Sequence, residues 1–103
     1  MVGKVKLIQY EFIAWLNRHA RETVGQTLSK WHCPIAEYII AQGCKDVVVF
    51  DDQVFYISEQ QRHNDTMPDW ARQFVHYIDI GSVRQTTVSG DDCLELLGQL
   101  NLL

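Results

Sequence analysis

Hydrophobic residues at intervals of three and four predict helices in two parts of the chain. The first helix is expected within residues 7–22, where the hydrophobic positions are Ile8, Phe12, Trp15 and Leu16. The second is expected within residues 67–81, where they are Met67, Trp70, Ala71, Phe74 and Ile78. Thr66 and Pro68 suit the start of this second helix, and Gly81 suits its end. Each helix is therefore expected to bury one face.

Two further helices are predicted from the residues that begin them. Pro34 suits the first helical position because its missing N–H needs no partner there, which makes Cys33 the N-cap. Gly43 suits the end of this helix. Ser89 is a favourable N-cap for a last helix, whose hydrophobic residues are Leu94, Leu96, Leu97 and Leu100.

The middle of the chain predicts a β-hairpin. Two β-branched and aromatic runs, within residues 46–50 and 54–58, flank the turn-forming residues Asp51, Asp52 and Gln53. Residues 85–88 are also β-prone and are a candidate third strand. Residues 23–30 and 58–66 are polar and interrupted, so we expect loops there. The predicted fold class is α+β, with about four helices packed on a small antiparallel β-hairpin or three-stranded sheet.

Length and composition narrow the class of protein. A chain of 103 residues with 47% hydrophobic residues predicts a single globular domain over residues 1–103. The sequence shows no run of about 18 apolar residues and no signal-peptide pattern, so we expect a cytoplasmic protein without a membrane span. Three cysteines at wide spacings favour free thiols over a disulfide framework.

Charge is distributed unevenly along the chain. Residues 1–32 hold five basic and two acidic residues, a net charge of +3, and the remainder carries −7 of the total of −4. We interpret this mainly as salt bridging within the fold. Weak nucleic-acid binding is an alternative, and the residues for it are Lys4, Lys6, Arg18, Arg21 and Lys30, with Tyr10 and Trp31 nearby. No phosphate loop or aromatic RNA-binding motif accompanies them, so a nucleic-acid partner is not favoured.

The stretch from Trp31 to Pro34 offers the clearest candidate chemistry. A thiol at a helix N-cap lies near the positive end of the helix dipole, which favours the thiolate. The alternative enzyme hypothesis is therefore a small thiol enzyme with Cys33 as nucleophile, His32 or His63 as base and Asp65 as an orienting residue. The simpler interpretation, which we prefer, is that Cys33 is a small hydrophobic residue at a helix start.

Other chemistry has little support in the sequence. The histidines and cysteines have no paired metal-ligand spacing, so we expect neither a metal nor another cofactor. The acid pairs Asp51-Asp52 and Asp91-Asp92 have local explanations in a hairpin turn and a helix first turn.

Aromatic residues point to an interaction surface. Three tryptophans and four tyrosines are more than a small core needs, and exposed aromatic clusters are favoured interface anchors. We expect a non-catalytic binding protein that forms a homodimer or contacts a protein partner. The predicted anchors are Trp31 and Trp70, and the predicted polar contacts are Arg62 and His63.

Short motifs of this chain can be compared with those of known families. The motifs are CPIAEYI and MPDWARQFVHYID, together with the β-prone Val88. They resemble small proteins carried by phages and other mobile elements, in which Cys-Pro-aliphatic-Ala opens one helix and aliphatic-Pro precedes another. The resemblance covers about half the chain and implies no activity. It implies an accessory protein of a mobile element that binds a host or element protein. The segment RQTTVSGDDC lacks the proline that often follows the last strand in such proteins.

Overall fold

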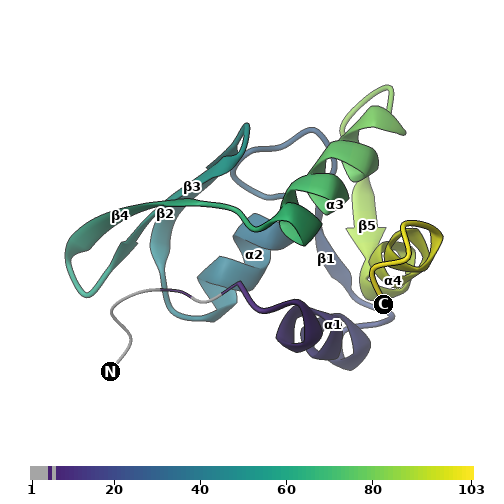
Figure 1. Ribbon diagram of the computed structural model, residues 1–103, viewed down its shortest axis with the longest axis horizontal. Coiled ribbons are helices and arrows are strands. Elements are labelled where there is room, and N and C mark those ends of the chain that lie inside the picture. The colour runs from purple at the N-terminus through teal and green to yellow at the C-terminus, as the bar shows by residue number, and fades with distance from the viewer. Residues whose placement is uncertain (1–4, 6) are drawn as a thin grey trace.

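A computed structural model describes Val5 and residues 7–103 of the chain. The elements follow in the order α1 (Gln9–Arg18), β1 (Thr23–Gln26), α2 (Pro34–Ala41), β2 (Lys45–Phe50), β3 (Gln53–Ser58), β4 (Gln61–Thr66), α3 (Asp69–Ile80), β5 (Thr87–Ser89) and α4 (Gly90–Gln99). Helix α2 lies against the sheet of β2, β3 and β4 (Figure 1). Helix α4 packs against both α1 and α3. The fold class is α+β, as the sequence predicts.

Four helices begin where the hydrophobic pattern and the cap residues place them. Cys33 is the N-cap of α2 with Pro34 at the first position, and the chain leaves the helix through Gly43, whose φ of 96° is open to glycine. Ser89 caps α4 in a capping box with Asp92. Helix α1 is shorter than predicted and ends at Arg18, because the backbone turns at His19.

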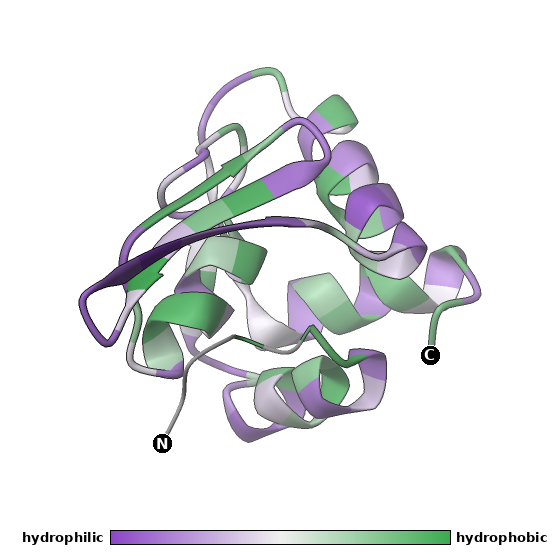
Figure 2. Cartoon of the chain, turned by 60° about the vertical axis from the view of Figure 1, so that its left-hand side comes forward, coloured by the Kyte–Doolittle hydropathy of each residue, from purple (hydrophilic) through white to green (hydrophobic). Residues whose placement is uncertain are grey.

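The predicted hairpin forms, with Phe50 directly opposite Gln53. Its third strand, however, is β4 and not residues 85–88. Strand β4 pairs with β3 in register from Gln53↔Thr66 to Ser58↔Gln61. The prediction of a loop over residues 58–66 was wrong because β4 is an edge strand made only of polar residues, seen as the hydrophilic strand in Figure 2.

A second sheet joins two short strands from opposite parts of the chain. Strand β1 pairs with β5 in antiparallel fashion, with a bulge between Thr23 and Gly25. The prediction of a loop over residues 23–30 was wrong for these first four residues. Gly25 is required here because a Cβ at this position would lie 2.6 Å from the nitrogen of Pro34.

The core lies between the helices and one face of the three-stranded sheet. Aromatic side chains dominate its centre, where the ring of Phe12 lies 5.4 Å from Phe74 and 5.2 Å from Tyr38. On the sheet, the buried residues are Val47, Val49, Val54 and Tyr56. They alternate with residues of the opposite face, as the strand period of two requires.

Candidate interaction surface

The Trp31–Pro34 stretch is a helix start with a buried thiol. Cys33 caps α2, is 2% exposed and belongs to the hydrophobic core. Burial raises the pKa of Cys33 from its ordinary value of 9.0 to about 11, although the N–H groups of Ala36 and Ile35 act in the opposite direction. The lowering of the pKa by these N–H groups at the helix start is therefore smaller than the rise caused by desolvation. The thiol is therefore held in its neutral form at pH 7.

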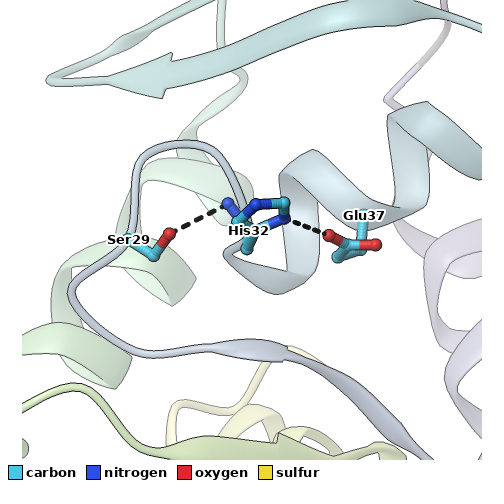
Figure 3. A network of polar contacts seen from close by, with 3 residues as sticks. All are labelled: Ser29, His32 and Glu37. Carbon is cyan, nitrogen blue, oxygen red and sulfur yellow. Dashed lines mark hydrogen bonds and ion pairs between the residues drawn. The ribbon is translucent and has the colours of Figure 1, made fainter.

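The imidazoles proposed as bases for Cys33 have other contacts. Nδ1 of His32 lies 2.9 Å from Oε1 of Glu37, as Figure 3 shows. Ser29, His32 and Glu37 look like a nucleophile, base and acid, but Oγ of Ser29 accepts a hydrogen bond from the backbone N–H of His32 and not from its ring. This network orders the turn before α2. It lacks the hydroxyl-to-imidazole contact that an activated serine needs.

His63 and Asp65 lie on β4 and contact Tyr56. The rings of His63 and Tyr56 stack with centroids 4.9 Å apart. The Tyr56 hydroxyl donates to Oδ2 of Asp65 at 2.7 Å and accepts the N–H of Val5 at 3.0 Å. Burial, with the Asp65 hydrogen bond, raises the pKa of Tyr56 to about 12. Among the described residues, neither His63 nor Asp65 is hydrogen-bonded to Cys33, and these contacts stabilise the inner side of the sheet.

The two predicted tryptophan anchors differ in exposure. Trp31 is 54% exposed, and the ammonium of Lys30 lies 4.8 Å from its ring centroid. Trp70 is partly buried and packs against the core, with its ring 5.5 Å from that of Phe12. Trp31 is therefore available to a partner, and Trp70 mainly completes the core.

Phe50 and Phe55 are exposed aromatic residues that the sequence analysis did not single out. They are 60% and 39% exposed. Both lie on the face of the sheet opposite the core, which also carries Val48 and Ile57. We call Val48, Phe55 and Ile57 the open sheet face. The alternation of hydrophobic residues in both strands was visible in the sequence, but alternation does not say which set of side chains faces the core.

Opposite charges flank the open sheet face. Arg62 of β4 lies directly opposite Ile57 of β3, and so shares its face. Asp46 lies in the bulge of β2, where its φ is 50°. Asp46 and Arg62 line one shallow depression of about 380 Å³ together with Phe55 and Ile57. Lys45 of β2 is also directly opposite Ile57, so the surface has an apolar centre, a base on β4, and an acid beside a base on β2.

The basic residues considered for nucleic acid come from different segments, and Arg18 is the last residue of α1. Lys4 and Lys6 lie outside the described residues. Lys30 contacts the rings of Trp31 and Phe50. Within Val5 and residues 7–103, no group of three or more metal-ligating side chains converges, and no helix is long and apolar enough to span a membrane.

Fold and surface together define an α+β protein in which one partly apolar sheet face is left uncovered by Val5 and residues 7–103. Comparison of this chain with models of protein families, with curated proteins and with solved structures gave no significant match. Its function must therefore be argued from its own residues.

Proposed function

We propose that the protein is a non-catalytic interaction protein that self-associates through the open sheet face. The observation that carries this proposal is the partial exposure of Val48, Phe55 and Ile57 on a face that has no packed counterpart among the described residues. Sheets commonly bury such a face against a second sheet about 10 Å away. A second copy of this chain offers a sheet of the same size and character.

The charges flanking the open sheet face fit a two-fold dimer. A two-fold axis parallel to β3 places β2 of one copy over β4 of the other and keeps the level of each residue along the strands. Asp46 directly follows Lys45, which pairs with Ile57, and Arg62 also pairs with Ile57. In this arrangement Arg62 of each copy lies over the Lys45–Asp46 corner of the other, and its expected partner there is Asp46, which lines the same depression as Arg62. One such opposite-charge pair then lies on each side of the interface.

The size of the face sets the expected strength. Three strands of six residues each cover roughly 15 by 20 Å, and a stable interface buries about 800 Å² per partner. The face, roughly 300 Å², is less than half of that area, so we expect a weak dimer that forms only at high protein concentration. An accessory role in a mobile element and a cytoplasmic location remain part of the proposal, on the resemblance and composition described above.

The test uses charge reversal and sedimentation velocity over a range of concentrations. The wild type is expected to shift from monomer to dimer as its concentration rises. Asp46→Lys places two bases against each other, and Arg62→Asp places two acids against each other, so each variant alone is expected to be monomeric. An equimolar mixture of the two variants restores both opposite-charge pairs and is expected to form a heterodimer.

Thermal unfolding of each variant at low concentration verifies that it is folded. A wild type that stays monomeric at several hundred micromolar would refute self-association. A dimer that neither charge variant weakens would refute the open sheet face as its interface.

A further inference from the structure

A groove lies between the loop before α2, the turn of the hairpin and helix α3. Two adjoining depressions, of about 370 and 520 Å³, form it and share Leu28, Asp51, Val75 and Asp79. Exposed apolar side chains line its length, and these are Leu28, Trp31, Phe50 and Ile80. The groove thus has apolar side chains along its length. It is separate from the centre of the open sheet face.

The loop that forms one wall of the groove is held in a fixed conformation. Leu28 has a φ of 56°, a left-handed conformation that costs a leucine energy, and yet its side chain is 43% exposed. The backbone N–H of Leu28 donates a hydrogen bond to Oδ1 of Asp79 at 2.8 Å, and the Leu28 carbonyl accepts one from Nε2 of Gln85 at 3.3 Å. The neighbouring Thr27 is fixed by the N–H of Thr86 at 3.0 Å. An apolar side chain is therefore presented to solvent by a preorganised backbone.

The charges of the groove are not balanced. Three carboxylates line it, from Asp51, Asp52 and Asp79, and none forms an ion pair with a residue of the described part of the chain. Arg72 at one end is paired with Asp69. Lys30 at the other end is placed between aromatic rings, 4.8 Å from Trp31 and 5.4 Å from Phe50. The three carboxylates thus outnumber the cations that line the groove, and of these Arg72 is already paired with an acid.

We propose that this groove binds a peptide segment of a partner protein that carries lysine or arginine residues on either side of leucine-like side chains. The apolar part of such a segment fits against Leu28, Trp31 and Ile80, and its cations fit the three carboxylates. The fixed loop lowers the entropy lost on binding. This inference does not depend on self-association, because a monomeric protein has the same groove.

The experiment measures binding of a fluorescein-labelled peptide of twelve residues, alternating leucine and lysine, by fluorescence anisotropy. A peptide with glutamate in place of lysine is the charge control. The variant Asp51→Asn/Asp52→Asn removes two charges from the groove, and asparagine tolerates the left-handed backbone of position 51, where φ is 58°. It is expected to weaken binding roughly three- to tenfold. Trp31→Ala is expected to weaken it at least about fivefold.

Asp91→Asn/Glu95→Gln is the matched control, since it removes two exposed acids from α4, which does not line the groove. It is expected to change the affinity less than twofold. Amide chemical shifts of the ¹⁵N-labelled protein locate the site, with Leu28 and the Trp31 indole expected to move.

Three outcomes would overturn the proposal. Equal loss of affinity in both double variants would mean general charge attraction, and equal binding of the glutamate peptide would mean that the carboxylates are not used. Chemical-shift changes at the groove that follow protein concentration without peptide would assign the groove to a second copy. The monomeric Arg62→Asp variant is expected to bind the peptide as the wild type does, which separates this test from that of the dimer.

Discussion

The two faces of the three-stranded sheet are built from neighbouring residues and differ in burial. The inner face, with Val49, Val54 and Tyr56, is 1–4% exposed and packs against the core beneath. The outer face, with Val48, Phe55 and Ile57, has similar side chains but remains partly exposed. A strand whose two faces are both hydrophobic is typical of a sheet covered on both sides. Here one cover, α2, belongs to the same chain, and a second cover is proposed to come from another copy.

This difference shows that hydrophobicity alone does not tell a core face from an exposed face. The side chains on the two faces differ by one position in the sequence, and only their neighbours in space distinguish them. Free energy of unfolding should therefore depend on the inner face, and association on the outer one. Four predictions examine this distinction.

The largest effect is expected from two adjacent aromatic residues. Tyr56→Ala removes a side chain that is 2% exposed and two hydrogen bonds, and should lower the free energy of unfolding by about 3–5 kcal/mol. Phe55→Ala should lower it by less than about 1 kcal/mol while weakening the dimer. Urea denaturation at low protein concentration measures the first effect and sedimentation the second. Equal destabilisation by both substitutions would remove the distinction between the faces.

Alkaline pH should lower the free energy of unfolding, because thiols are buried in the core. Burial raises the pKa of Cys33 to about 11 and that of Cys93 to about 12, above the ordinary value of 9.0. Above pH 9 the unfolded chain loses these protons and the folded chain keeps them, so the free energy of unfolding falls as pH rises, by up to about 1.4 kcal/mol per pH unit for each thiol.

Denaturant unfolding between pH 8 and 10.5 measures this loss, and Cys33→Ala should make the decline shallower. Alkylation gives a second measurement. The native thiols should react slowly at pH 8, whereas a new thiol at Phe55→Cys should react at an ordinary rate in the dilute monomer. A fast reaction at Cys33 would contradict its burial and revive the thiol-enzyme hypothesis.

A smaller effect is expected when valine is replaced by threonine, which has nearly the same shape. Val49→Thr places a hydroxyl on the inner face and should cost about 1–3 kcal/mol. Val48→Thr places it on the outer face and should change the free energy of unfolding by less than about 0.5 kcal/mol. Thermal unfolding of the two variants gives the comparison directly. Their order would be reversed if the outer face were the covered one.

The smallest effect is expected from salt on the proposed dimer. The pairs between Asp46 and Arg62 lie near the rim of the interface, where exposed ion pairs contribute about 0–1 kcal/mol each. Raising ionic strength from 0.05 to about 0.5 M should weaken association a few-fold in the wild type through screening. The mixture of charge-reversed variants should respond in the same way. If the dimer became tighter as salt was raised, it would be held by apolar contacts and not by these ion pairs.

The helices could be predicted because their signals are local. The spacing of hydrophobic residues indicated α1 and α3, and Pro34 and Ser89 marked the starts of α2 and α4. A helix satisfies its backbone within its own segment, so the residues that begin and end it lie close together in the sequence.

The two missed pairings lacked such local signals. Strand β4 follows a two-residue turn in which Glu59 and Gln60 both have positive φ, 52° and 66°. Hairpins of this kind usually contain asparagine or glycine, so the turn was not recognised. The pairing of β1 with β5 joins segments far apart in the sequence, and neither strand is long enough to show a period.

The candidate site was only partly predictable for the same reason. Trp31 and Arg62 were selected from the sequence and lie on exposed surfaces, whereas Trp70 packs against the core. Phe55, Asp46 and Leu28 became candidates only when the sheet register and the contacts of the loop were known.

The sequence by itself determined the helices, their caps and the hairpin, because each depends on residues within a few positions of one another. The tertiary structure decided which face of the hairpin became the core, where Cys33 was buried, and which carboxylates met in the groove beside Leu28. Those outcomes depend on contacts between distant segments, whose free energy is not encoded in any one stretch of the chain.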